Sequence, residues 1–177
     1  MRLLALLLSC TLALAAESKN PAAKPAGAEH TIAEFNLGRA VIGTGDLEKT
    51  KGKGVVIEAW GVNCPPCIAS LPHLQELSVK HKDKVLFFGA ECQMSDKKAI
   101  QAVIKKAGVT YPIFSGLDKC PINFSAIPRA FVFDADGKMI YDGSPSSGDF
   151  TKAVEKAAES SKPGLPTKHA PAPKAKA

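Results

Sequence analysis

Apolar residues follow two patterns along the chain, one typical of strands and one typical of helices. Continuous apolar runs, largely β-branched or aromatic, at 55–60 and 85–91 predict strands that are covered on both faces of a sheet. Apolar residues that recur every three to four positions predict amphipathic helices at 65–81 and 95–108. These four elements alternate, which indicates that the middle of the chain is organised around one sheet.

Weaker signals complete the pattern on either side. We expect a helical turn at 46–50, a short strand at 111–114, a helical turn around 119–124 and a closing helix at 148–161. Two hairpins are also expected, an N-terminal one from 31–37 and 39–43 across Gly38, and one at 129–143 that turns at 135–137. Ser95 and Gly108 should cap the helix at 95–108. The strands and helices alternate, and an antiparallel hairpin follows them near the end of the chain. This order predicts an α/β fold with a mixed sheet.

Composition separates the two ends of the chain from its middle. Residues 1–16 hold one basic residue, an apolar run and then small residues, which predicts a signal peptide and an exported protein. The run is too short for a membrane anchor, whereas Cys10 leaves a lipoprotein signal open as a lesser alternative. Residues 17–30 and 162–177 are rich in Ala, Pro and Lys, and predict a flexible linker and a disordered tail around one domain at 31–161.

The net charge of +6 does not predict a nucleic-acid partner. A nucleic-acid-binding domain carries its basic residues on one face of the fold. Here the middle of the chain is nearly neutral, and the excess lies at the ends, on Arg2, Lys162, Lys168, Lys174 and Lys176.

The sequence NCPPC lies between a predicted strand and the start of the helix that follows it. Backbone N–H groups and the dipole at a helix N-terminus favour a thiolate there. Cys64 is therefore the expected exposed nucleophile. Cys67, one turn further on, is the expected buried thiol that closes an intramolecular disulfide, and Pro65 suits the first helical position.

Other roles for two cysteines at this spacing find less support. A structural zinc site needs four ligands, and the chain has no second C-x-x-C or H-x-x-x-H to complete one. Haem attachment needs a histidine at position 68, which is Ile, and a copper carrier needs a nearby histidine, whereas His73 is expected on the helix surface. An inert structural disulfide stays open. We expect a redox-active pair, with no metal and no cofactor.

Several motifs at matching distances give the chain a resemblance to a known family. They are Trp60, Cys64, Cys67, Pro72, Ile127-Pro128 and the turn 134–137. Over residues 31–160 the chain resembles the exported thiol-disulfide oxidoreductases of the TlpA/ResA type. The resemblance implies a thioredoxin-like fold with an N-terminal β-hairpin and a central helix-strand insertion, here 95–114.

The resemblance also assigns roles to single residues. Pro128 is expected to be a cis-proline facing the disulfide, with Ile127 offering its backbone to a substrate strand, although an ordinary loop proline stays open. Trp60 is expected to pack beneath the site and support substrate binding. Glu58 falls where thioredoxins keep a buried acid, and a raised pKa would let it accept the proton of Cys67, unless it is a solvated glutamate at a sheet edge.

Three positions depart from the family pattern. Asn63 stands where an aromatic residue is common, and Ser70 where an acid is common. Arg129 replaces the usual small hydroxyl residue after the cis-proline. A guanidinium near Cys64 would favour its thiolate and make the pair more oxidising, so substrate choice and redox potential are left open.

Two further cysteines remain after the predicted signal peptide. Cys92 ends the strand at 85–91, and Cys120 precedes Pro128 by eight residues. The resemblance places these two segments near one another, which predicts a second disulfide between Cys92 and Cys120. Two separate buried thiols are the alternative.

Together these features predict a thiol-disulfide oxidoreductase that acts on exported proteins, most simply in the bacterial periplasm and as a monomer. The resemblance implies a reductant that a membrane-embedded electron donor recharges, with apocytochrome c or a copper-site cysteine pair among its targets. A disulfide oxidant or isomerase, a copper chaperone and a binding module on the same fold are the alternatives.

Overall fold

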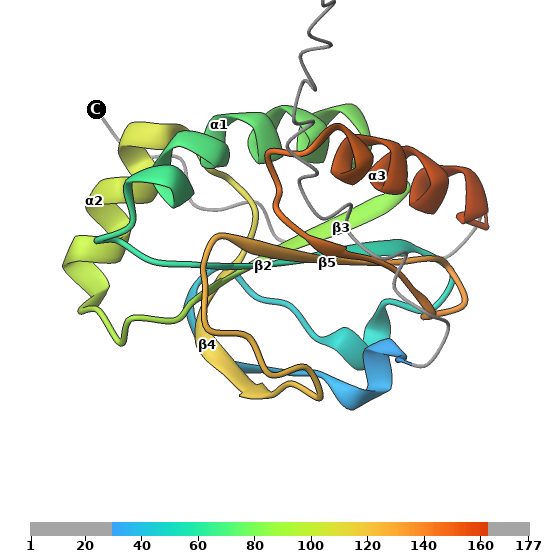
Figure 1. Ribbon diagram of the computed structural model, residues 1–177, viewed down its shortest axis with the longest axis horizontal. Coiled ribbons are helices and arrows are strands. Elements are labelled where there is room, and N and C mark those ends of the chain that lie inside the picture. The colour runs from blue at the N-terminus through green and yellow to red at the C-terminus, as the bar shows by residue number, and fades with distance from the viewer. Residues whose placement is uncertain (1–29, 163–177) are drawn as a thin grey trace, which may run out of the picture.

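The computed structural model describes residues 30–162, which form a mixed sheet with helices packed on it (Figure 1). The strands are β1 (Asn36–Ile42), β2 (Gly54–Trp60), β3 (Val85–Glu91), β4 (Ile113–Lys119), β5 (Arg129–Phe133) and β6 (Met139–Gly143). The helices are α1 (Pro65–Lys80), α2 (Lys97–Ala107) and α3 (Gly148–Ser160), with short 3-10 helices η1 (Ile32–Glu34) and η2 (Leu47–Lys49). The predicted α/β fold with a mixed sheet is confirmed.

The six strands lie in the order β1-β4-β3-β2-β5-β6. Strand β3 lies parallel to both β2 and β4. The other pairs are antiparallel: β1 with β4, β5 with β2, and β6 with β5. The central strands β2 and β3 are buried along their whole length, which explains their continuous apolar runs. The predicted insertion between β3 and β5 is present as α2 and β4.

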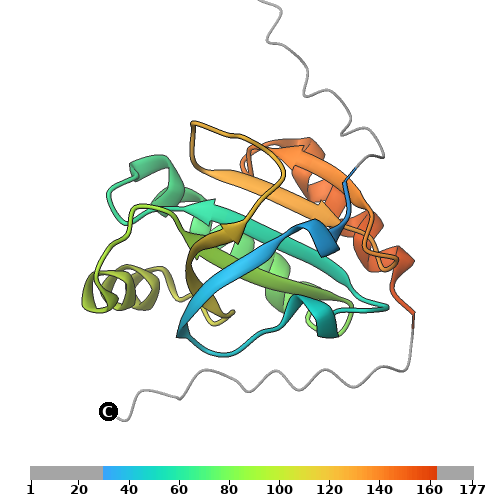
Figure 2. The same cartoon turned by 90° about the horizontal axis from the view of Figure 1, so that it is seen from below.

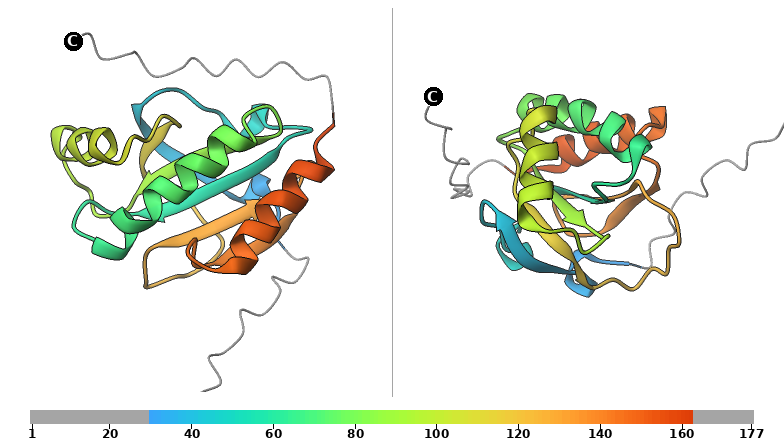
Figure 3. Two further views of the ribbon diagram at one scale, coloured as in Figure 1. Left: turned by 90° about the horizontal axis from the view of Figure 1, so that it is seen from above. Right: turned by 90° about the vertical axis from the view of Figure 1, so that its left-hand side faces the viewer.

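The two faces of the sheet are covered differently. Helices α1 and α3 lie side by side over one face, and the chain from η1 to η2 lies under the other (Figures 1 and 3). Figure 2 shows the second face, which β1 crosses. Buried residues accordingly form two cores, a helix-side core around Trp60, Leu71 and Val132, and an opposite core around Phe35, Phe88 and Phe131.

The N-terminal hairpin predicted from 31–37 and 39–43 is wrong. Residues 32–34 form η1, and β1 runs without a turn through Gly38 to pair with β4, far along the chain. A Cβ at Gly38 would collide with the carbonyl oxygen of Ser115, so this glycine permits close strand pairing rather than a turn.

Two smaller predictions are also corrected. Helix α2 is capped by Asp96, whose side chain accepts from the backbone N–H groups of Lys98 and Ala99, and not by Ser95. The helical turn predicted around 119–124 is absent from the described chain, because β4 continues to Lys119. Gly108 ends α2 in the left-handed conformation, with φ of 71°, as predicted.

Several predictions fall on segments that the structure does not describe. The signal peptide at 1–16, the possible lipid attachment at Cys10, all but the last residue of the linker at 17–30 and all but the first residue of the tail at 162–177 lie outside it. Within residues 30–162, no helix has the length and apolar character needed to cross a membrane.

Candidate functional site

A disulfide joins Cys64 and Cys67 where β2 passes into α1. Cys64 is the N-cap of α1, and the backbone N–H of Cys67 donates to its Sγ at 3.3 Å. Cys67 is fully buried and Cys64 keeps 7% of its surface exposed, less than the exposed position predicted for it. Because an N-cap sulfur faces free N–H groups, this position favours a thiolate on Cys64 after reduction.

The segment before β5 meets the disulfide from the other side. The Ile127–Pro128 peptide bond is cis, as the resemblance implied. The Ile127 carbonyl oxygen lies 3.7 Å from Cys64 Sγ, so residues 63 positions apart share one site. The structure therefore brings together Cys64, Cys67, Ile127 and Pro128.

Glu58 lies in the middle of β2 and is completely buried, which excludes a solvated glutamate at a sheet edge. Its Oε1 lies 3.2 Å from Ser70 Oγ on α1, and its Oε2 accepts from the Tyr111 hydroxyl at 3.3 Å. Burial raises the pKa of Glu58 to about 8, against the opposing effect of these two hydrogen bonds. Ser70 Oγ also donates to the Cys67 carbonyl at 2.8 Å, which links the acid to the first turn of α1.

Tyr111 is the titratable partner of Glu58. It is buried before β4, and burial together with the charge of Glu58 raises the pKa of its hydroxyl well above the usual range. In the sheet, Glu58 is flanked by Gly89 on β3 and Ala130 on β5, neither of which ionises. A Cβ at Gly89 would lie 2.6 Å from Ile113 Cδ1 and 3.1 Å from the indole Nε1 of Trp60, so this crowded layer requires glycine.

A second buried glutamate holds the loops around the cysteines. Glu91, at the end of β3, is 1% exposed and accepts from the Ser95 backbone N–H and hydroxyl and from the Val62 N–H. Beside it, Gln93 Oε1 accepts from the Asn63 N–H at 2.8 Å. The loop after β3 is thus hydrogen-bonded to the loop that ends in Cys64.

Arg129 is not brought to the cysteines. Its guanidinium donates to both carboxylate oxygens of Asp142, at 2.6 and 2.7 Å, and lies over the rings of Phe124 and Phe131. Phe131 belongs to the opposite core, whereas Cys64 belongs to the helix-side core. The arginine charge is therefore compensated on the face of the sheet away from the disulfide.

Trp60 ends β2 and is completely buried. It belongs to the same core as Cys64 and Cys67, and its ring has no exposed surface to offer a substrate. Its carbonyl accepts from the Cys92 N–H at 2.8 Å, which ties the ends of β2 and β3 together just before the cysteine loop.

The predicted disulfide between Cys92 and Cys120 is not formed, and both thiols are free. Cys92 Sγ donates to the Ala90 carbonyl, and Cys120 Sγ to the Ile122 carbonyl, each at 3.3 Å. Each sulfur is thus directed to a carbonyl on its own segment. Burial, with the charge of Glu91, raises the pKa of Cys92 to about 11, and burial also raises the pKa of Cys120.

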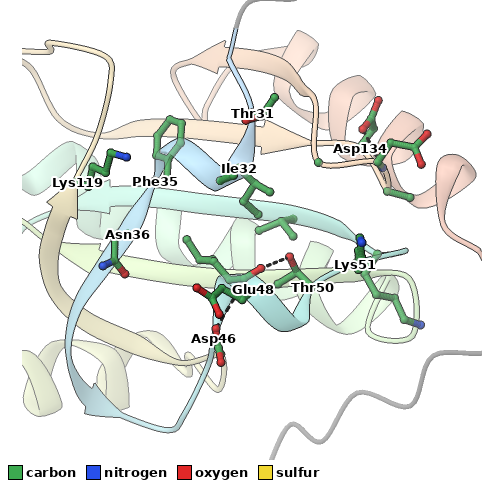
Figure 4. A pocket seen from close by; sticks show the side chains of 17 residues that line it. Thr31, Ile32, Phe35, Asn36, Asp46, Glu48, Thr50, Lys51, Lys119 and Asp134 are labelled. Carbon is green, nitrogen blue, oxygen red and sulfur yellow. Dashed lines mark hydrogen bonds between the residues drawn. The ribbon is translucent and has the colours of Figure 1, made fainter.

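A cavity of about 710 Å³ lies at the other end of the sheet (Figure 4). Its walls come from η1, β1, η2, the start of β2 and the turn between β5 and β6. Apolar residues such as Phe35 and Val55 adjoin acidic and basic ones, among them Asp46, Lys51 and Asp134. None of the site residues predicted from the sequence lines this cavity.

Among residues 30–162, no three His, Cys, Asp or Glu side chains gather closely enough to hold a metal ion. His73, considered above as a copper ligand, lies against Phe150 and Thr151 of α3.

A strand that leads through a cysteine pair into a helix, with a cis-proline opposite, is the arrangement of thioredoxin-like proteins. Residues 28–158 match the Redoxin family, and the chain belongs to that family. It is 30% identical over 101 residues to thiol-disulfide oxidoreductase ResA of Bacillus anthracis, a match covering 54% of this chain and 57% of the relative. The ResA protein of Bacillus subtilis (strain 168) is 26% identical over 98 residues, 54% and 55% of the two chains.

Solved structures show the same fold. A DsbF homologue from Corynebacterium diphtheriae is 25% identical, with a TM-score of 0.60 over 69% of this chain and 83% of that chain. A putative protein disulfide isomerase from Bacteroides thetaiotaomicron is 23% identical, with a TM-score of 0.57 over 71% and 87%. The family match and the ResA relatives confirm the resemblance to the TlpA/ResA type. The chain spans a little over half of the length of the curated relatives it matches.

Sequence reasoning missed three residues of the site: Tyr111, Glu91 and Gln93. Glu91 ends an apolar run, as Glu58 interrupts one, and that signal is present in the sequence. Tyr111 and Gln93 have no local signal, because their partners lie far away along the chain.

Proposed function

We propose that this protein is a thiol-disulfide oxidoreductase that exchanges electrons with cysteine pairs of other exported proteins. The observation that carries the proposal is the Cys64–Cys67 disulfide at the N-terminus of α1, with the Ile127 carbonyl 3.7 Å from Cys64 Sγ. Cys64, the more exposed sulfur, is the one an incoming thiolate reaches. A substrate segment that lies along Ile127 would bring its own sulfur to Cys64.

The reduction of the protein proceeds in two exchange steps. A thiolate of a donor dithiol attacks Cys64 Sγ, a mixed disulfide forms, and Cys67 leaves as a thiolate that takes a proton from Glu58. The second thiolate of the donor then attacks the donor sulfur of the mixed disulfide, and Cys64 leaves as a thiolate. Two electrons pass to the protein, and the donor becomes a disulfide.

The same steps in reverse reduce a substrate disulfide. The Cys64 thiolate attacks the substrate, and the Cys67 thiol gives its proton to the Glu58 carboxylate as it displaces the substrate sulfur. A carboxyl group whose pKa is about 8 can hold and release this proton near neutral pH. This is the catalytic role that we propose for Glu58.

We propose that the protein works as a reductant outside the cytoplasm, recharged by a membrane-embedded electron donor. The signal-like segment at 1–16 supports export. The ion pair of Arg129 with Asp142 supports the role of a reductant, because it compensates the positive charge that would have favoured an oxidising cysteine pair. Substrates with cysteine pairs that must stay reduced, such as apocytochrome c or a copper site, fit this role.

Reduction of insulin by dithiothreitol tests the activity. The wild-type protein should accelerate it, and Cys64→Ser should remove the acceleration. Cys120→Ser is the matched control, because it also replaces one sulfur but lies outside the disulfide, and it should keep the activity. Acceleration that survives Cys64→Ser would refute the proposal.

The equilibrium between the Cys64–Cys67 pair and glutathione tests the direction. A reductant should stay largely disulfide-bonded in buffers where an oxidant such as a DsbA-like protein is already reduced. A pair as oxidising as that of DsbA would instead establish the oxidant role.

A further inference from the structure

The hydroxyl of Ser70 stands between two acceptors and has one proton to give. Its Oγ lies 2.8 Å from the Cys67 carbonyl oxygen, which can only accept, and 3.2 Å from Glu58 Oε1. If Glu58 were a carboxylate, both neighbours would compete for the same proton. Both contacts are complete only when Glu58 Oε1 carries a proton and donates it to Ser70 Oγ.

The other oxygen of Glu58 agrees with this count. Tyr111 donates to Oε2 at 3.3 Å, which is the bond that the carbonyl oxygen of a neutral carboxylic acid accepts. The three bonds then run in one direction: Tyr111 donates to Glu58, Glu58 donates to Ser70, and Ser70 donates to Cys67. This chain of bonds leads from the buried acid to the backbone of the resolving cysteine.

We propose that Tyr111 and Ser70 are positioning residues that orient the neutral Glu58 acid while Cys64 and Cys67 are bonded and stabilise its carboxylate afterwards, and that the Ser70 hydroxyl turns from the Cys67 carbonyl to Glu58 when the acid gives up its proton. The inference rests on the proposed function, since it gives the acid of that site its partners. It goes beyond that function by assigning the location of the proton and a movement of one hydroxyl that accompanies its transfer.

The surroundings of Glu58 leave these two residues in control. The neighbouring strands contribute Gly89 and Ala130, which carry no charge. Within residues 30–162, the causes that set the pKa of Glu58 are burial, Ser70 and Tyr111, with no ion pair among them. In the reduced protein Cys67, whose carbonyl is bonded to the same Ser70 hydroxyl, is a further titratable group at the start of α1.

A neutral acid in the oxidised protein is the form that reduction requires. The Cys67 thiolate that leaves the disulfide needs a proton, and Glu58 holds one. Once the proton has moved, the carboxylate gains the Ser70 hydroxyl as a second donor beside Tyr111, so the charge that remains in the core keeps two hydrogen bonds.

The test is a pH titration of the oxidised protein followed by NMR, which involves no turnover. In protein with 13C-labelled carboxyl groups, the Glu58 Cδ signal is identified by its loss in Glu58→Gln, and it should titrate near pH 8 in the wild type. Tyr111→Phe should raise this midpoint by about one pH unit, a tenfold weaker acid, because the carboxylate loses a donor. Tyr141→Phe, which removes a hydroxyl bonded to Ser144 instead, should leave the midpoint unchanged.

The turning hydroxyl has its own signature. The carbonyl 13C signal of Cys67 should shift with the same midpoint as Glu58, since the carbonyl loses its Ser70 donor on ionisation. Ser70→Ala should abolish most of this shift and raise the Glu58 midpoint. The matched control is Ser78→Ala on the same helix, whose hydroxyl also donates to the carbonyl three residues before it, and it should change neither.

The outcomes separate the inference from the proposed function. An unchanged Glu58 midpoint in Tyr111→Phe, or a Cys67 shift that persists in Ser70→Ala, would overturn the inference even if insulin reduction still depends on Cys64. Loss of the proposed function would appear in the insulin assay and would leave these titrations as they are. A variant that fails to fold would be recognised by its amide spectrum, and the remaining variant would then decide.

Discussion

The buried acid makes the stability of the oxidised protein depend on pH in a direction opposite to that of most carboxyl groups. In the unfolded chain Glu58 has its ordinary pKa of 4.5, and in the folded protein burial raises that pKa to about 8. Between these values the unfolded chain has lost the proton and the folded protein has kept it, so raising the pH favours unfolding. Stability present below pH 4.5 is lost as the pH rises through about 8.

The size of the effect follows from this window. The free energy of unfolding should fall by about 1.4 kcal/mol for each pH unit inside it, to a total of at most about 5 kcal/mol. Glu58→Gln removes the titration and keeps the shape of the neutral acid, so the difference between wild type and variant isolates the contribution of this group. Other groups that titrate, such as His81, cancel in the difference.

Urea unfolding of the oxidised protein at pH 5, 6, 7, 8 and 9 measures the difference. The free energy of unfolding of the wild type, relative to that of Glu58→Gln, should fall steadily from pH 5 to pH 8 and level off by pH 9. Glu76→Gln, an exposed glutamate on α1, is the matched control and should run parallel to the wild type. A constant difference between wild type and Glu58→Gln across this range would refute the raised pKa.

Three further experiments probe the surroundings of the site. Arg129→Thr should shift the glutathione equilibrium of the active-site pair by less than about twofold, because the arginine charge is compensated elsewhere; a tenfold shift would contradict this. Timed alkylation of the oxidised protein at pH 8, followed by mass spectrometry, should label the thiols of both Cys92 and Cys120. Cys92 should react more slowly than Cys120, because it has about a hundredfold less thiolate than an ordinary thiol; no label on either residue would mean that they are bonded to each other. Gly89→Ala should lower the free energy of unfolding in urea by about 1–3 kcal/mol, since its Cβ meets Ile113; unchanged stability would show that the layer can relax.

The parts of the fold that the sequence predicted well are those where local pattern and burial agree. The runs at β2 and β3 are apolar because both faces of these strands are covered, and the helices α1 and α3 repeat at the helical period because one side faces the sheet. The failed N-terminal hairpin has the opposite cause. Gly38 predicts a turn from the sequence, but the reason for glycine at this position is the close approach of the Ser115 carbonyl on β4.

The site shows the same division between local and distant causes. The place of Cys64 and Cys67 at a helix start, on which their expected roles depend, is predicted by residues within a few positions of them. The partners of Arg129 and Ser95 could not be predicted in this way. Arg129 donates to Asp142, which lies on β6. The Ser95 hydroxyl donates to the buried Glu91, and Asp96 caps α2 instead.

The position of the acid explains the serine that departs from the family pattern. Ser70 Oγ lies 3.2 Å from Glu58 Oε1, so an acid at position 70 would place two carboxyl groups side by side in the core. Two such groups cannot both ionise, and one would be held neutral at a cost to the fold. A hydroxyl can accept from the neutral acid and donate to the carboxylate, which suits the proton transfer that we propose for Glu58. With its acid on β2, the chain therefore needs a residue such as serine, and no second acid, three positions after Cys67.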